Sequence, residues 1–128
     1  ASTLTTPGRP PIASGPPADF PEGEEDRWSP EHLLLAGLAS CTMISFLAHA
    51  DHKGVEVVDY DAEIGGTVMR RVEDGRYAFV HIHQRPRVTV AAGQSEQARE
   101  LIGKAERDCF ISASVSAEIQ NDWEILEA

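Results

Sequence analysis

An eighteen-residue stretch without an acidic or basic side chain apart from His49, residues 33–50, constrains the fold more than any other feature of this chain. The segment directly before it, Ser29-Pro30-Glu31, favours a helix start. Serine caps helices, proline fits the first helical position, and glutamate is stabilised at the positive helix end. We therefore expect one long helix over residues 29–52.

The length of this stretch is close to the roughly 20 residues that cross a bilayer. Its polar interruptions at Ser40, Thr42 and Ser45 and its acidic flanks argue against a membrane helix. A helix that is apolar nearly all round is more simply a central helix, covered by its own sheet and by a partner subunit. We expect a homodimer and no membrane contact.

A long β-hairpin is expected over residues 55–91, turning at Glu73-Asp74-Gly75. In both arms apolar side chains recur at every second position, which predicts one buried and one solvated face. Gly65-Gly66 indicates a bulge or bend. The residues expected to face inward are Tyr60, Ala62, Ile64, Val80, Ile82, Val88 and Val90.

The remaining segments complete a single domain over residues 1–128. Residues 94–109 predict a second helix, which Ser95 can cap, and residues 116–126 predict a closing strand. Residues 1–27 predict a short strand and then a loop, because six prolines disfavour a helix or a ladder. The expected fold is α+β with an antiparallel sheet. The apolar stripe of the second helix is Ala98, Leu101, Ile102, Ala105 and Cys109, and the inward residues of the closing strand are Ile119, Trp123 and Ile125.

Composition narrows the class of function. The net charge of −10 repels phosphate backbones, so we expect no binding to nucleic acid. The chain does not open with a charged region followed by an apolar one, so we expect a cytoplasmic protein. Two cysteines are too few for a disulfide scaffold.

The two cysteines lie on helix faces that must both be buried. Cys41 is in the middle of the long helix, and Cys109 is on the apolar stripe of the second. If both faces pack on one core, the thiols can come within disulfide reach, a Cα separation of about 4.4–6.8 Å. The residues alone leave two interpretations open: inert buried thiols or a redox pair.

The histidines do not complete a metal site. His49 and His52 are near a helix end, and His81 and His83 share one strand face, but no carboxylate or cysteine completes either set. We interpret His49 as a favourable partner of the helix C-terminus. No metal is expected.

Two segments together resemble a known family. The segment SPEHLLLAGLASC at residues 29–41 and the segment AERDCFISASV at residues 105–115 are similar to motifs of the osmotically inducible protein C / organic hydroperoxide resistance (OsmC/Ohr) family. The pattern is a Pro-Glu helix start, a cysteine ten residues after the glutamate, and a Cys-x-x-Ser turn at the second helix. The matching residues are Pro30, Glu31, Cys41, Cys109 and Ser112.

The resemblance implies an OsmC-like fold in an intertwined homodimer, with active sites at the subunit interface. It also implies thiol-dependent reduction of organic hydroperoxides. In that reaction Cys41 attacks the hydroperoxide and becomes a sulfenic acid, and Cys109 resolves it as a disulfide. A dithiol reductant, of lipoyl type or a small thiol, restores both thiols. No cofactor is implied.

In the family an arginine, oriented by a glutamate, steadies the attacking thiolate. Glu31 matches that glutamate, but ten helical residues separate it from Cys41 by about 15 Å. Glu31 would therefore act through a long arginine or on the partner subunit's cysteine. Arg27, beside the helix start, is our candidate for the arginine.

The mouth of the site is expected to be apolar and suited to alkyl or lipid hydroperoxides. Met43, Phe46 and Phe110 are our candidates for its lining, and Phe110 stands where relatives often carry proline. The alternative function is a redox-sensing or binding module of the same fold, whose thiols form a disulfide but turn over little peroxide.

Overall fold

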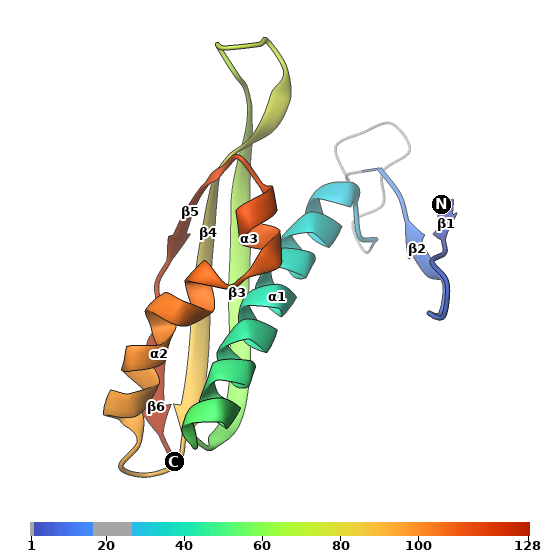
Figure 1. Cartoon of the computed structure of the whole chain (residues 1–128). Helices are drawn as coiled ribbons and strands as arrows, with labels where there is room; N and C mark the ends of the chain where they lie inside the picture. The colour runs from blue at the N-terminus through green and yellow to red at the C-terminus, as the bar shows by residue number, and fades with distance from the viewer. Residues whose placement is uncertain (1, 17–26) are drawn as a thin grey trace. The chain divides into compact units, whose positions relative to one another are not determined.

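The computed structural model describes residues 2–16 and 27–128 (Figure 1). The chain forms two compact units, Ala1–Ala36 and Gly37–Ala128. The long helix α1, Pro30–Lys53, belongs to both units.

The first unit contains a small antiparallel ladder. β1, Ser2–Leu4, pairs with β2, Ile12–Ser14. The strand at the start was predicted, but the expectation that the prolines prevent a ladder was wrong. Pro7, Pro10 and Pro11 all lie in the connection between the strands, where a fixed φ and a missing N–H are tolerated. The rest of the expected proline-rich loop, residues 17–26, lies outside the described residues.

The predicted start of α1 is confirmed. The Ser29 hydroxyl accepts a hydrogen bond from the backbone N–H of His32 (3.3 Å), and the Ser29 N–H donates to His32 Nδ1 (3.1 Å), as in a capping box. The helix ends at Gly54, whose φ of +73° closes it in the left-handed conformation. By length and composition α1 could cross a membrane, a test that core helices of soluble proteins also pass.

The second unit is built on the predicted hairpin. β3, Val57–Arg70, pairs antiparallel with β4, Tyr77–Val90. The turn between them holds the Arg71–Asp74 ion pair at 2.6 Å. The bulge expected at Gly65-Gly66 was misplaced: both glycines stay in register, and the irregularities fall at Val57/Asp59 and Thr67/Val68.

The sheet is mixed, so the prediction of an antiparallel sheet was wrong. β5, Glu118–Asn121, and β6, Glu124–Glu127, both pair parallel to β4. The helical segment after β4 returns the chain to the beginning of that strand, so the next strands run in the same direction as β4 (Figure 1). The single strand expected over residues 116–126 is two strands, interrupted at Asp122 and Trp123.

The second helix expected over residues 94–109 is confirmed, and a further short helix follows it. α2, Ser95–Arg107, is followed by the short α3, Phe110–Ser114. Gln94, not Ser95, occupies the N-cap of α2, without a side-chain capping bond. Cys109 lies between the two helices, at the N-cap of α3.

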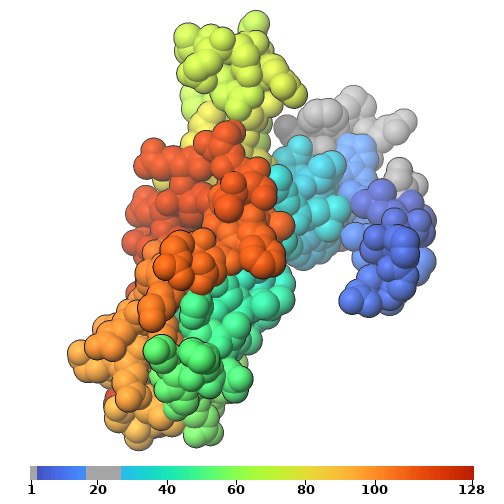
Figure 2. All heavy atoms as spheres, viewed as in Figure 1, coloured from blue at the N-terminus to red at the C-terminus, as the bar shows by residue number. Residues whose placement is uncertain are grey.

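The core of the second unit lies where the second half of α1 and α2 cover one face of the sheet (Figure 1). Phe46 packs on Trp123 and Tyr60, with ring centroids 5.2 and 6.3 Å apart. This arrangement confirms the predicted α+β fold, with a long helix and a second helix packed on a sheet. In Figure 2 the end of the hairpin projects beyond the helices of this unit. The buried core cluster is Phe46, Ala50, Val55, Val88, Val90, Ala98, Leu101 and Ala105.

Candidate active site

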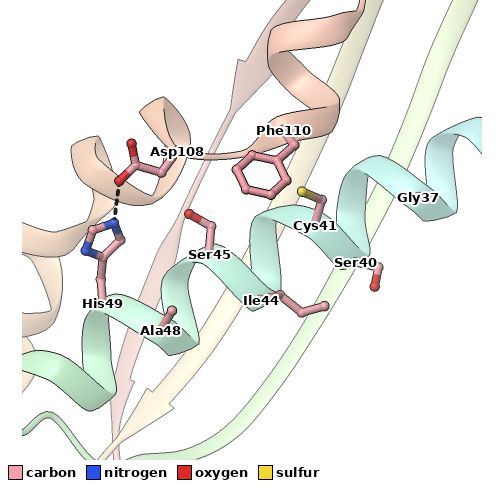
Figure 3. Close-up of a pocket in the computed structure, with 9 residues that line it drawn as sticks. All are labelled: Gly37, Ser40, Cys41, Ile44, Ser45, Ala48, His49, Asp108 and Phe110. Atoms are coloured by element: carbon pink, nitrogen blue, oxygen red, sulfur yellow. Dashed lines mark hydrogen bonds and ion pairs between the residues drawn. The ribbon is translucent and has the colours of Figure 1, made fainter.

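A pocket of about 530 Å³ with an almost entirely apolar surface runs along one face of α1 (Figure 3). Its lining residues on α1 recur every three or four positions, which places them on one side of a helix. Asp108 and Phe110, on either side of Cys109, complete the lining. The residues from α1 are Gly37, Ser40, Cys41, Ile44, Ser45, Ala48 and His49.

Cys41 is half-buried at this pocket, whereas Cys109 is buried, with 1% of its surface exposed. Both are free thiols, and the Cys41 thiol lies within hydrogen-bonding reach of Cys109. The fold therefore brings together the two cysteines that are 68 residues apart in the sequence. A small reactant in the pocket reaches Cys41, and Cys109 lies behind it.

The Cys-x-x-Ser turn fixes the backbone at Cys109. The Ser112 hydroxyl donates to the Cys109 carbonyl (2.9 Å) and lies 3.4 Å from the Glu106 carbonyl. The turn thus joins the end of α2 to the start of α3 and points Phe110 outward, with 79% of its surface exposed.

Opposing effects act on the Cys109 thiol. Burial raises its pKa, but hydrogen bonds from Thr42, Ser112 and Cys41 lower it further than burial raises it. The pKa of Cys109 therefore lies below its usual value, which favours the reactive thiolate.

A hydrogen-bond chain, buried at Thr42 and Gln84, leads away from Cys109. The Thr42 hydroxyl lies 3.5 Å from the Cys109 Sγ, and Gln84 Nε2 donates to Thr42 (3.2 Å) and to Asn121 (2.9 Å). Asn121 Nδ2 then donates to the Glu106 carboxylate (2.8 Å). This chain of hydrogen bonds was not predicted from the sequence. Its signal was Gln84, a polar residue at an inward-facing position of the second hairpin arm.

Two contacts tie α1 to the end of α2. His49 Nε2 and Asp108 Oδ2 are 2.8 Å apart at one end of the pocket, and the Ser45 hydroxyl donates to the Ala105 carbonyl (2.8 Å). His49 was interpreted as a partner of its own helix end. Its partner is instead the aspartate next to Cys109. Among the described residues no three or more His, Cys, Asp or Glu side chains cluster as a metal site.

The three residues expected to line the mouth of the site lie in different places. Phe110 lines the pocket, Phe46 is fully buried in the core, and Met43 is not among the lining residues. Helical geometry explains the difference, because positions 43 and 46 are turned away from the face that carries Cys41.

Glu31 and Arg27 lie in the first unit. Glu31 is in the first turn of α1, and its Oε2 is buried without a hydrogen-bond partner among the described residues. Arg27 lies beside Gly15, where an added Cβ would be 3.5 Å from the Arg27 Cδ. Their roles toward Cys41 remain predictions.

Known proteins are similar to this chain in sequence and in fold. The uncharacterized protein YmaD of Bacillus subtilis (strain 168) is 28% identical over 103 residues, which are 77% of this chain and 67% of YmaD. An OsmC-like protein of unknown function from Vibrio cholerae matches with a TM-score of 0.84 and 25% identity, over 94% of this chain and 82% of that one. The organic hydroperoxide resistance protein OhrB of Bacillus subtilis has the same fold, with a TM-score of 0.59 and 23% identity, over 83% of this chain and 78% of OhrB.

The sequence profile of the family described as OsmC-like protein matches residues 23–124. The match includes α1, the hairpin, α2 and both cysteines. This chain therefore belongs to the OsmC-like protein family.

Proposed function

We propose that this chain is a thiol peroxidase that reduces organic hydroperoxides to alcohols, with Cys41 as the attacking thiol and Cys109 as the resolving thiol. The observation that carries the proposal is a half-exposed cysteine at an apolar pocket, backed by a second, buried cysteine. The name of the family relative OhrB supports the class of substrate.

In the first step the Cys41 thiolate attacks the terminal oxygen of the hydroperoxide. A sulfur–oxygen bond forms, the O–O bond breaks, and the alkoxide leaves as the alcohol after taking up a proton. The sulfur loses two electrons and becomes a sulfenic acid. The apolar pocket around Cys41 suits an alkyl substituent on the peroxide and excludes water from it.

In the second step the Cys109 thiolate attacks the Cys41 sulfur. The disulfide forms, the sulfur–oxygen bond breaks, and the hydroxide leaves as water after protonation. A dithiol reductant, of lipoyl type or a small thiol, then supplies two electrons and two protons and restores both cysteines. The resolving thiol needs no access to the peroxide, which agrees with the burial of Cys109.

The attacking thiolate needs a positive partner. We assign this role to Arg27, oriented by Glu31, on the resemblance to the family. Glu31 is ten residues from Cys41 in one helix, about 15 Å along its axis, so it does not touch that cysteine directly. In a homodimer it can act on the partner subunit's thiol. We propose that the protein works as such a dimer in the cytoplasm.

Anaerobic titration of thiols, before and after one equivalent of cumene hydroperoxide, tests the redox pair. We expect both thiols of each chain to be lost and one equivalent of alcohol to be released. Repeated additions with a dithiol present then separate a peroxidase from a redox-sensing module. A peroxidase consumes many equivalents, whereas a sensor stops near the first. A chain that keeps both thiols after peroxide would contradict the proposal.

A further inference from the structure

Thr42 lies between the buried resolving thiol, Cys109, and the hydrogen-bond chain that begins at Gln84. It is 2% exposed and follows Cys41 on α1, but its side chain points away from the pocket and into the core. Its hydroxyl has three neighbours: it donates to the Leu38 carbonyl (3.0 Å), accepts from Gln84 Nε2 (3.2 Å), and lies 3.5 Å from Cys109 Sγ.

The end of this hydrogen-bond chain at Glu106 determines which group donates and which accepts in each of its bonds. The Glu106 carboxylate accepts hydrogen bonds from Asn121 Nδ2 (2.8 Å) and from the Trp123 indole N–H, which can only donate (3.3 Å). Asn121 therefore presents its oxygen to Gln84. Gln84 must present its NH₂ group to Asn121, and the second hydrogen of that group reaches Thr42.

The orientation of Gln84 is held by its two donated hydrogen bonds. Its Oε1 is buried and has no partner within the described part of the chain. Buried amide oxygens are usually paired. In Gln84 the oxygen stays unpaired, while both N–H donors of the amide are engaged. Gln84 is therefore fixed as a donor to the Thr42 oxygen.

With one acceptor site of Thr42 filled by Gln84, the hydroxyl hydrogen can go to two places. When Cys109 is a thiol, its S–H donates to Thr42 and the hydroxyl hydrogen points to the Leu38 carbonyl. When Cys109 is a thiolate, the hydroxyl hydrogen rotates to the sulfur. The Leu38 carbonyl then keeps its helical bond from the Thr42 N–H, so no group is left unsatisfied.

We propose that Thr42 is a two-position hydrogen-bond donor that stabilises the thiolate of Cys109, and that Gln84 is the positioning residue that holds Thr42 in this role. The assignment deepens the proposed peroxidase function and rests on it for its chemical purpose. Cys109 is 1% exposed, so water does not solvate its charge, and a buried hydroxyl takes the place of solvent. The Thr42 hydrogen bond is one of the contacts that lower the pKa of Cys109.

The chemical consequence belongs to the second step of the reaction. Cys109 must lose its proton before it attacks the Cys41 sulfenic acid and expels hydroxide. Thr42 therefore affects the rate of disulfide formation and leaves the first attack on the peroxide unchanged. This separation distinguishes it from a residue that merely packs the core.

The first test measures the pKa of Cys109 in a Cys41→Ser background, where Cys109 is the only cysteine. The ultraviolet absorbance of the thiolate is followed against pH. Thr42→Val, which keeps the shape of the side chain, should raise the pKa of Cys109 by about one pH unit or more, the effect of losing a hydrogen bond to a charged group. Thr42→Ser should restore it. Thr89→Val is the matched control, the same exchange at a half-buried position of β4 that lies outside the pocket lining and the hydrogen-bond chain.

An unchanged pKa in Thr42→Val, or a Thr42→Ser variant that behaves like valine, would overturn the assignment. This titration needs no peroxide turnover, so it stands even if the proposed peroxidase activity fails. If Thr42→Val does not fold by circular dichroism, Gln84→Met takes its place. It should raise the pKa in the same direction by a smaller amount, and no change would again overturn the assignment.

The second test follows one turnover with both cysteines present. In Thr42→Val the loss of the first thiol after cumene hydroperoxide should keep its wild-type rate. Disulfide formation should slow about tenfold near neutral pH, in proportion to the lost thiolate. Dimedone should then trap more Cys41 sulfenic acid than in the wild type. Equal slowing of both steps would indicate a structural role only and contradict the proposal.

Discussion

At the scale of single residues, two phenylalanines show how position decides role. Phe46 and Phe110 were both expected at the mouth of the site, but one is fully buried in the core and the other is 79% exposed beside Cys41's pocket. Phe46 faces the sheet because it is turned away from Cys41 around the helix. Phe110 faces outward because Cys109, directly before it, is buried at the turn between α2 and α3.

The first prediction concerns the choice of substrate. The wild type should reduce cumene hydroperoxide with a higher kcat/KM than hydrogen peroxide. Phe110→Ala should reduce this preference by at least about fourfold, the effect of one CH₂ group removed from water, ~0.8 kcal/mol. Tyr77→Ala is the control, since Tyr77 is similarly exposed (76%) on the hairpin and does not line the pocket. Equal preference for both peroxides in the wild type would contradict the apolar mouth.

The second prediction separates the two cysteines. Cys41→Ser should abolish peroxide consumption, because a serine hydroxyl is far less acidic than a thiol. Cys109→Ser should consume one equivalent and accumulate a sulfenic acid on Cys41, which dimedone traps and mass spectrometry locates. Continued peroxide should inactivate this variant by overoxidation. A dimedone adduct on Cys109 in the Cys41→Ser protein, with none on Cys41 in the other variant, would reverse the assignment.

At the scale of elements, the site depends on how α1 is joined to the turn after α2. The His49–Asp108 pair and the Ser45–Ala105 hydrogen bond both join α1 to the C-terminal end of α2. Together they hold the residue before Cys109 against the helix that carries Cys41. A loosened junction would separate the thiols without changing either of them.

The third prediction tests this junction by its pH dependence. Hydrogen bonds from Arg107 and then His49 lower the pKa of Asp108 from 3.8 to about 2. Because the folded pKa is depressed, the stabilisation is present above the unfolded pKa and is lost as the pH falls through the range from 3.8 to about 2.

Asp108→Asn should therefore lower the Tm at pH 6, and the difference from the wild type should shrink toward zero near pH 2. Circular dichroism melts at both pH values measure this. Asp51→Asn, at an exposed position near the end of α1, is the control and should show a smaller difference. A Tm difference for Asp108→Asn that persists at low pH would show that the charge of Asp108 is not what matters.

At the scale of the whole molecule, α1 leaves apolar surface to be covered. Only a third of the most apolar 18-residue stretch of α1 is buried. Ile44, in the middle of the helix, is 59% exposed. Soluble proteins seldom expose a continuous apolar face of this kind. We propose a second copy of the chain as the occupant, because Glu31 can then act on the partner subunit's cysteine.

The fourth prediction is that the protein is a dimer at micromolar concentration. Light scattering should give twice the chain mass of 13.9 kDa. Ile44→Glu should weaken the dimer at least about tenfold, because a charge would be buried against apolar surface. Val72→Glu is the control, as Val72 is 96% exposed in the hairpin turn. A well-behaved wild-type monomer would contradict the dimer and the proposed role of Glu31.

The sequence by itself determined the elements whose signals are local. The Ser29 cap and Pro30 define the start of α1, and the alternation around Ile82 and Val88 defines the buried face of β4, because capping and side-chain alternation act between near neighbours. The two cysteines were also identified from the sequence, through short motifs that lie wholly within single segments.

Only the tertiary structure decided the features that depend on how distant segments of the chain pack together. The parallel pairing of β5 and β6 with β4 follows from the path of the chain through α2, which no strand pattern records. The hydrogen-bond chain from Cys109 through Thr42 and Gln84 joins α1 to β4, elements whose partners are chosen by packing. A buried polar residue signals that it has a partner, but the identity of that partner is settled only when the core closes.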